Sequence, residues 1–168
     1  MKSELQQEIK TTFEQLYQTL SLFEQNQINV VPFESSWTAG QVTKHIIKAT
    51  SGFYQICNGK TQKLNGVPDE KVAVLEGIFL DFTTKYNSPD FIYPENKEYE
   101  KKELLSRLHK IEKEILDIAV NYDLTQTCLD FEIPGIGNLT IYELVSFAIL
   151  HTKRHIHQLQ NIQQKIKN

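Results

Sequence analysis

The segment H-T-K-R-H-I-H-Q, residues 151–158, contains three of the five histidines in a chain of 168 residues. His151 and His155 are four positions apart, so on a helix their rings project from one face, separated by about 40° and by about 6 Å along the axis. Two neutral imidazoles in that arrangement can clamp a divalent metal ion. The spacing alone is a weak signal, because it arises by accident in about one chain in ten of this kind.

The apolar face of the surrounding helix strengthens the signal. This helix is expected to begin at Thr140, where Thr140 and Glu143 form a capping box. Apolar residues then recur at steps of three and four, and His151 and His155 occupy two consecutive positions of that stripe. His45 lies in the same way on the inner stripe of an earlier predicted helix. We therefore predict that His45, His151 and His155 meet in the core, where each neutral ring needs a partner for its polar edge.

The other histidines and the cysteines are not predicted to take part in chemistry. His109 lies among charged residues on the outer face of its helix, and His157 is about 200° around the helix from His155. Both are interpreted as surface residues. Cys57 and Cys128 are too few for a disulfide framework or a thiolate metal cluster, and we interpret both as small core thiols.

Four long helical patterns are expected to position the histidines, and no run of alternating strand residues is convincing. Their apolar stripes span residues 5–23, 38–56, 99–120 and 140–166. The second and third patterns are separated by residues 58–98, which contain one shorter predicted helix at 69–84. A link of that length can cross the bundle, so that the third helix runs parallel to the second. We predict an all-α four-helix bundle with a long crossover between helices 2 and 3, formed as a single domain over residues 1–168.

Composition and charge exclude several functional classes. The formal net charge is −3, and basic and acidic residues are interspersed, so no basic field is available for nucleic acid. The longest apolar run is too short to span a membrane, and the start M-K-S-E-L-Q-Q-E-I-K lacks a secretory signal, so we expect a cytoplasmic protein. The G-I-G motif at residues 135–137 lacks the strand and third glycine of a dinucleotide loop and is interpreted as a turn before the last helix.

Three spaced motifs resemble those of the DinB-like family of four-helix metalloproteins, which includes bacillithiol transferases. They are W-T-x-x-Q-V-x-x-H at residues 37–45, H-x-x-x-H at 151–155 and R-H-x-x-Q at 154–158. The resemblance covers nearly the whole chain. It implies a divalent metal, zinc or nickel, held by His45, His151 and His155, with water at the open position, and it implies that a homodimer is possible. Many relatives have H-R-G-Q after the last ligand, where this chain has H-I-H-Q.

Three neutral nitrogens would leave the charge of such a metal uncompensated. A bound water is then acidified, to a pKa of about 7 in known sites, and a bound thiol is deprotonated. The metal hydroxide can hydrolyse an ester or amide, or the thiolate of a low-molecular-weight thiol can attack an electrophile, as the resemblance implies. We expect a metal-dependent transferase or hydrolase that acts on a small molecule. The sequence assigns no general base and no cofactor-binding residue beyond the three histidines.

Two other classes of function stay open at this stage. The chain is also compatible with a metal-binding or sensor protein without catalysis. Alternatively, it is a metal-free structural or interaction bundle in which the histidines only form hydrogen bonds with one another. Metal-dependent turnover separates the enzyme from the binder, and a thermal stability that does not change with a chelator is expected of the metal-free bundle.

Overall fold

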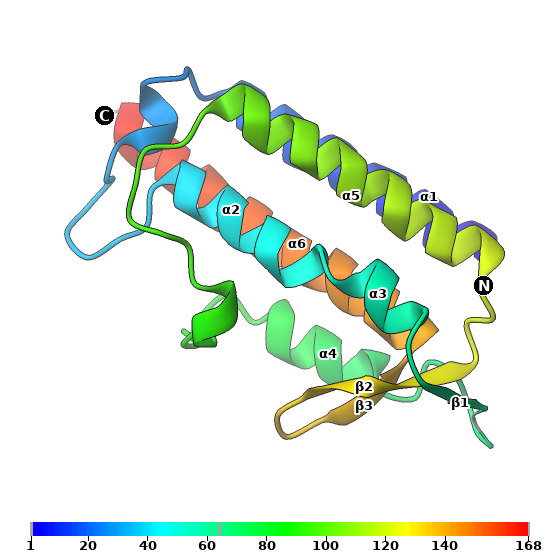
Figure 1. Cartoon of the computed structure of the whole chain (residues 1–168). Helices are drawn as coiled ribbons and strands as arrows, with labels where there is room; N and C mark the ends of the chain where they lie inside the picture. Colours follow the sequence, from blue (N-terminus) through cyan, green and yellow to red (C-terminus); the bar gives the residue numbers. More distant parts are fainter. Residues whose placement is uncertain (1, 64, 168) are drawn as a thin grey trace.

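The computed structural model describes residues 2–63 and 65–167. Most of this part of the chain is helical, and a small three-stranded sheet lies at one end (Figure 1). In chain order the elements are α1 (Lys2–Ser21), a 3₁₀ turn (Gln27–Asn29), α2 (Ala39–Thr50), α3 (Phe53–Cys57), β1 (Thr61–Lys63), α4 (Val72–Phe79), a second 3₁₀ turn (Asp90–Ile92), α5 (Lys101–Asn121), β2 (Gln126–Ile133), β3 (Gly137–Thr140) and α6 (Ile141–Lys167).

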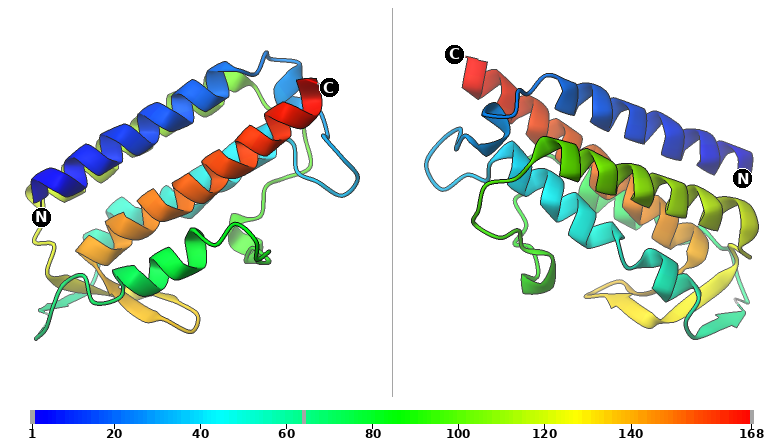
Figure 2. Two further views of the ribbon diagram at one scale, coloured as in Figure 1. Left: turned by 180° about the vertical axis from the view of Figure 1, so that it is seen from behind. Right: turned by 45° about the horizontal axis from the view of Figure 1, so that its top comes forward.

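The four long helices, α1, α2, α5 and α6, pack against one another around a shared apolar core. α2 and α5 run in the same direction, which is the direction that the long link between them predicts, and α1 and α6 run the opposite way (Figure 1). The shorter α4 packs against α6, so that α6 lies between α1 and α4 (Figure 2). The inner face of α6 is therefore enclosed by helices that are far apart in the sequence.

Both predicted capping boxes are confirmed. At the start of α2, the Thr38 hydroxyl accepts a hydrogen bond from the Gln41 amide at 3.1 Å, and the Gln41 side chain accepts one from the Thr38 amide at 2.9 Å. At the start of α6, the same two bonds join Thr140 and Glu143 at 3.0 and 2.9 Å. These bonds satisfy amides that a helix leaves without partners in its first turn, and so they fix where each histidine-bearing helix begins.

Two predicted helices are shorter than expected. The second pattern was predicted as one helix over residues 38–56, but α2 ends at Thr50 and a separate α3 begins at Phe53. Ser51 and Gly52 lie at the break, and glycine costs about 1 kcal/mol relative to alanine inside a helix. The helix predicted at residues 69–84 is formed only over Val72–Phe79.

The sheet corrects the expectation of an all-α chain without strands. β2 pairs antiparallel with β1 on one side and with β3 on the other. The turn between β2 and β3 contains Gly135 and ends at Gly137, with φ of 81° and 84°, a backbone region in which glycine avoids a steric cost. The G-I-G motif is thus a turn, as predicted, but it closes a hairpin. Leu129, Phe131 and Ile133 alternate with acidic residues before it, which is the strand signal that the sequence analysis missed.

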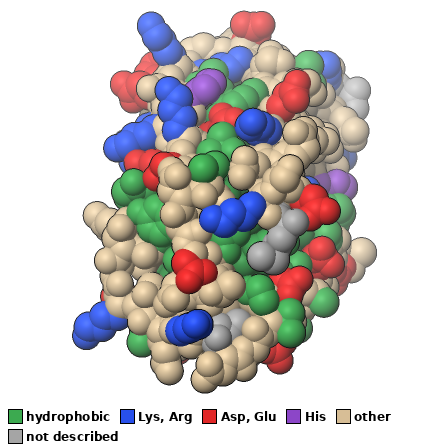
Figure 3. Space-filling model, turned by 90° about the vertical axis from the view of Figure 1, so that its right-hand side faces the viewer, with side chains coloured by type: hydrophobic (Ala, Val, Ile, Leu, Met, Phe, Trp, Pro, Cys, Tyr) green, Lys and Arg blue, Asp and Glu red, His purple; other side chains and the backbone are tan. Residues whose placement is uncertain are grey.

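No helix in the described ranges, 2–63 and 65–167, is long and apolar enough to cross a membrane. The side of the molecule drawn in Figure 3 shows acidic and basic side chains interspersed among apolar ones, without a field of one sign. That distribution agrees with the net charge of −3 in the sequence. A long-range electrostatic attraction to a phosphate backbone is therefore not expected on this face.

Candidate metal centre

The three predicted histidines come together in the core. His45 projects from the middle of α2, and His151 and His155 project from adjacent turns of α6. All three are buried, with exposed fractions of 2%, 4% and 7% in that order. The Nε2 atom of His151 lies 3.0 Å from Nε2 of His45 and 3.2 Å from Nε2 of His155. We call this group the histidine cluster.

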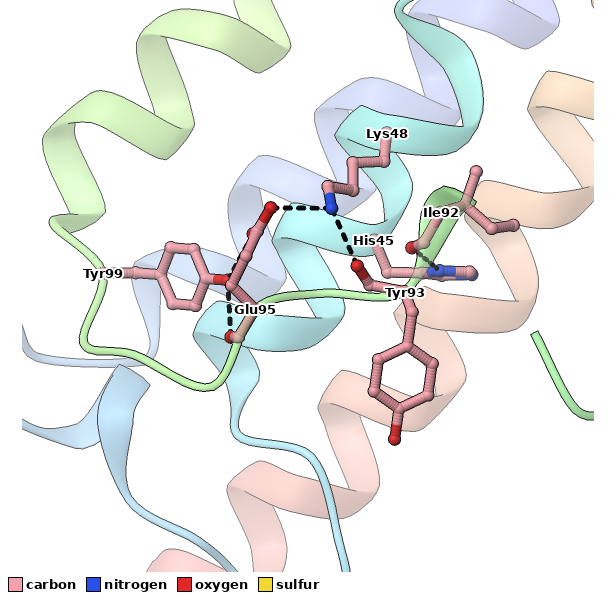
Figure 4. Close-up of polar contacts among 6 residues, drawn as sticks. All are labelled: His45, Lys48, Ile92, Tyr93, Glu95 and Tyr99. Carbon is pink, nitrogen blue, oxygen red and sulfur yellow. Dashed lines mark hydrogen bonds and ion pairs between the residues drawn. The ribbon is translucent and has the colours of Figure 1, made fainter. Parts of the chain in front are cut away.

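The orientation of His45 is fixed by the segment that precedes α5. Its Nδ1 atom lies 2.9 Å from the backbone oxygen of Ile92 (Figure 4). A carbonyl oxygen can only accept a hydrogen bond, so Nδ1 of His45 carries the proton and donates it. The Nε2 atom of the neutral ring then carries a lone pair, which points toward His151.

His155 is oriented in the same way by its own helix. Its Nδ1 atom lies 2.8 Å from the Oε1 atom of Gln158, which is three residues further along α6. With the amide oxygen in that place, Nδ1 donates and Nε2 of His155 also presents a lone pair. The R-H-x-x-Q motif therefore has a physical role, because the glutamine selects the tautomer of the last histidine.

His151 cannot satisfy both of its neighbours. Its Nδ1 atom has no hydrogen-bond partner among the described residues, and its Nε2 atom faces two lone pairs. A proton on Nε2 can serve one neighbour and leaves Nδ1 as a buried acceptor without a donor. A proton on Nδ1 brings three lone pairs together instead. Either choice leaves a buried polar atom unpaired, which costs about 1–3 kcal/mol. A cation among the three Nε2 atoms would bind the converging lone pairs of the second arrangement, in which Nδ1–H of His151 stays without an acceptor.

Burial keeps the three rings neutral. Desolvation lowers the pKa of His45, against the opposing effect of the Ile92 carbonyl. It lowers the pKa of His151 well below the ordinary value, aided by the neighbouring imidazoles. Desolvation, followed by repulsion from His45, lowers the pKa of His155 to about 3. Neutral imidazole is the form that binds a metal, so the cluster is in its ligand state at neutral pH.

The cluster passes a simple geometric test for a metal site. Each histidine can direct one nitrogen to a common point, and the three ligand atoms lie within 4.8 Å of one another. Nitrogens at about 2.0–2.1 Å from a tetrahedral metal are about 3.3 Å apart, close to the two observed separations. Hydrogen bonds from Nδ1 to a carbonyl or amide oxygen, which two of the rings make, are the usual outer support of a histidine ligand. The residues fit a three-histidine site.

Residues 90–99, which we call the strap, are held on α2 by further polar contacts. Lys48, one turn after His45, donates to the backbone oxygen of Tyr93 at 2.8 Å and pairs with Glu95 at 2.7 Å (Figure 4). The Tyr99 hydroxyl donates to the backbone and the carboxylate of Glu95 at 2.8 and 3.1 Å. The lysine pair is the largest cause of the lowered pKa of Glu95, about 2. The strap thus keeps the Ile92 carbonyl in place.

Aromatic side chains surround the rings. Trp37 lies with its centroid 5.1 Å from that of His45, and its indole donates to the Tyr93 hydroxyl at 3.3 Å. Phe147 stacks on His151 at 5.4 Å, and Phe79 of α4 meets the same ring edge to face at 5.8 Å. This apolar shell excludes water from the deep side of the cluster and strengthens electrostatic interactions there.

One side of the cluster opens into a cavity of about 460 Å³. His155 forms part of its wall, together with Trp37, Tyr93 and Gln158. The segment that follows α4 forms another part of the wall and is held by Arg154, whose guanidinium donates to the backbone oxygens of Asp81 and Thr84. A small molecule in this cavity would contact the cluster at His155.

The comparison with family models matches residues 8–159 to the DinB superfamily. The chain belongs to the DinB superfamily. No curated protein and no solved structure matched in the other two comparisons. The match includes α2 and the part of α6 that carries His151 and His155, and it establishes the family that the spaced motifs suggested.

The remaining sequence predictions about this DinB chain have mixed outcomes. His109 is exposed, as predicted, and its ring stacks on Tyr17 at 4.3 Å. His157 was predicted to face solvent or a partner, but it is half-buried, stacks on Phe82 at 4.2 Å and forms part of the cavity wall. Its position could not be foreseen, because Phe82 belongs to the irregular segment after α4, whose path the sequence does not define.

Both cysteines are buried thiols, as predicted. Cys57 ends α3 and Cys128 lies on β2, and a hydrogen bond between the two thiols raises the pKa of Cys57 and lowers that of Cys128. Their contact joins α3 to the sheet, away from the histidine cluster in the sequence and in the fold. Sequence reasoning missed the contact because it missed the strand.

Proposed function

We propose that this DinB-superfamily protein is a metal-dependent enzyme that acts on a small molecule, with His45, His151 and His155 as the metal ligands. The observation that carries the proposal is the tautomer pattern of the histidine cluster. The bonds to Ile92 and Gln158 make two of the rings present Nε2 lone pairs toward the third. The chain therefore cannot supply hydrogen-bond partners for all of the ring nitrogens. A divalent cation is the group that three converging lone pairs accommodate.

The reaction class follows from the ligand set. When bound, a zinc or nickel ion would lower the pKa of a coordinated water or thiol, so that a nucleophile forms near neutral pH. Hydrolysis and thiol-dependent transfer to an electrophile are the two reactions that we propose. The chain's own contribution is to hold the rings through Ile92 and Gln158, to keep them dry through Phe79 and Phe147, and to admit the substrate beside His155.

The fold and assembly belong to the same proposal. We infer that the four long helices form the DinB-like bundle with its long crossover, since the link 58–98 connects two parallel helices that both pack on the core. A homodimer is proposed from the family resemblance. The small size of the cavity favours a low-molecular-weight substrate over a macromolecule.

Metal content tests the ligand assignment. The wild-type chain, incubated with zinc or nickel and then desalted, is expected to retain one metal ion per chain by elemental analysis. His151→Ala is expected to retain almost none, because the central ligand is lost. His109→Ala serves as the matched control, since His109 is an exposed histidine on α5, and it should retain the wild-type amount. Unchanged metal content in His151→Ala, or no metal in the wild type, would remove the proposal.

Turnover separates the enzyme from the alternatives. A small thiol with an aromatic electrophile, and an activated ester without the thiol, should be consumed faster by the metal-loaded protein than by His151→Ala. A metal-binding or sensor protein would retain metal but show no turnover that depends on it. In a metal-free bundle, added zinc would leave the melting temperature unchanged, because a ligand that binds only the folded form raises it by mass action.

A further inference from the structure

The cavity beside the histidine cluster has a charge that differs from that of the whole chain. Of the sixteen residues that line it, two are cationic, Lys85 and Arg154, and none is an aspartate or glutamate among the described residues. The chain as a whole has more acidic than basic residues, 21 against 18. A cavity wall with this excess of positive charge attracts an anion at short range.

Two acidic residues are adjacent in the sequence to residues of this wall, Glu34 and Asp81, and neither lines it. Asp81 is turned toward its own loop. The carboxylate of Asp81 accepts hydrogen bonds from the Thr83 amide and from the hydroxyls of Thr83 and Thr84. It does not line the cavity. Lys85 follows this turn, is exposed and has no ion pair with a described residue, so its ammonium group is available to a ligand.

The cavity is also unusually aromatic. Five of its lining residues are Phe33, Trp37, Phe82, Tyr86 and Tyr93. All but the tryptophan are about half exposed, between 46% and 53%. Large apolar side chains left open to water around one concavity are typical of a binding site, because a ligand that covers them removes apolar surface from water. Flat rings favour a planar ligand through stacking and edge contacts.

The aromatic and the cationic side chains share the wall of the same space. Trp37 and Tyr93 are in contact through ring packing at 5.2 Å and line the side next to His45. Arg154 lies over the Tyr86 ring at 5.2 Å and holds the loop that carries Lys85. A ligand in this space would place a planar body against the aromatic wall and a negative group toward the cations, with His155 at its side.

The geometry points to a small organic anion with a planar or aromatic body as the substrate class of this cavity. This inference rests on the proposed function, because it names the kind of molecule that the same site receives. The anionic group is recognised by Lys85 and Arg154, and the planar part is recognised by the aromatic wall. In this inference, recognition of the negative charge does not require a metal.

The single tryptophan of the chain provides the measurement. Because Trp37 lines the cavity, its indole N–H gives one resolved resonance that reports on occupancy in a ¹H–¹⁵N spectrum. Benzoate, benzamide and benzylammonium, which share a ring and differ in charge, are titrated into the chelator-treated full chain. We expect saturable shifts with benzoate binding about two- to fivefold tighter than benzamide, and benzylammonium weakest.

Charge variants test the origin of the preference. Lys85→Gln should bring benzoate close to benzamide, and Lys85→Glu should invert the order of benzoate and benzylammonium. Lys113→Gln is the matched control, since Lys113 is an exposed lysine on α5, which contributes nothing to the cavity wall, and it should behave as the wild type. The Lys85 side chain is exposed and forms no ion pair with a described residue, so its variants should keep the melting temperature of the wild type.

The outcomes separate this inference from the proposed function. If the metal-free chain shows no shift of the Trp37 resonance, or the same affinity for all three probes, the inference is overturned, even where His45, His151 and His155 bind metal. A preference for benzoate that appears only after zinc is added assigns the charge recognition to the metal and also overturns it. A preference that persists without metal, in a chain that fails the metal test, supports the inference and removes only the metal proposal.

Discussion

Two buried polar groups that involve α6 differ in whether their polar atoms all have hydrogen-bond partners within the chain. Near the start of the helix, Glu143 is 2% exposed, and one carboxylate oxygen accepts from the Lys71 amide at 2.7 Å while the other accepts from the Thr140 amide at 2.9 Å. Two turns further on, the histidine cluster is equally buried but leaves the Nδ1 atom of His151 without a partner. Partners from within the chain satisfy both oxygens of the first group, whereas in the second the Nε2 atoms of His45 and His155 both face the Nε2 atom of His151. The second group is the one that we propose holds a metal.

The largest expected difference between the two groups is their response to acid. Burial lowers the pKa of all three clustered histidines in the folded state, whereas the unfolded chain keeps values near 6.5. Below that pH the unfolded state binds more protons, so the stability present above pH 6.5 is lost as the pH falls. Each ring whose folded pKa lies well below 5.5 contributes about 1.3 kcal/mol to the loss between pH 7 and pH 5.5, so two such rings give about 2.5 kcal/mol and three give about 4 kcal/mol.

Urea unfolding of the metal-free chain across that range measures this loss. His151→Gln removes one of the three titrating rings and should reduce the slope by a third or more, whereas His109→Gln should leave it unchanged. A stability that is flat between pH 7 and pH 5.5 would show that the rings are not held neutral by burial.

Removing the carboxylate of Glu143 should be the next largest effect. Glu143→Ala leaves the amides of Lys71 and Thr140 without acceptors at the junction of α4 and α6, and the expected loss is about 3 kcal/mol, with or without metal. Gln41→Ala, at the equivalent position of the α2 capping box, should lose only about 1 kcal/mol. Urea unfolding compares them, and equal losses would refute a special structural role for Glu143.

In contrast to Glu143, the histidine cluster should change the stability by an amount that depends on metal. At a free zinc concentration a hundred times the dissociation constant, the wild type is expected to gain about 3 kcal/mol of stability by mass action. His151→Ala should lose that gain. Its metal-free form is expected to stay folded with a loss of about 2 kcal/mol, because the cavity left beside Phe79 and Phe147 is offset in part by the removal of the unpaired Nδ1 atom. Melting curves with zinc and with a chelator give both values. A metal-free variant that is unfolded would instead make His151 a structural residue.

The strap should have the smallest effect. Lys48→Met removes both contacts that hold residues 93 and 95 but keeps the length of the side chain, so the Ile92 carbonyl and the His45 tautomer are less firmly fixed. We expect zinc affinity to fall about tenfold, as for other residues that support a metal ligand. Lys113→Met on α5 is the control. Titration calorimetry measures the affinities, and an unchanged value would show that the strap does not position His45.

The sequence predicted the parts of the site that depend on local periodicity. The stripes of α2 and α6 placed His45, His151 and His155 on inner faces, and the two capping boxes set the helix starts. These features are encoded within a few residues of one another, and the same holds for the bond from His155 to Gln158. Periodicity therefore carries most of the information about which rings converge.

The parts that escaped prediction depend on contacts between distant segments. The support of His45 comes from Ile92, forty-seven residues away at the end of a short 3₁₀ turn. The cavity position of His157 depends on Phe82, and the pairing of β1 with β2 joins residues 61–63 to 126–128. The hairpin is different, because alternation at Leu129 to Ile133 followed by two glycines was visible in the sequence.

The most direct test of the central claim is an anomalous-scattering experiment on crystals grown with zinc, with data collected on both sides of the zinc absorption edge. The account predicts one strong peak at about 2.0–2.1 Å from the Nε2 atoms of His45, His151 and His155, with the Nδ1 atoms of the first and last still bonded to Ile92 and Gln158. A map without a peak there, in which the Nε2 atoms remain about 3 Å apart in direct hydrogen bonds, would contradict it.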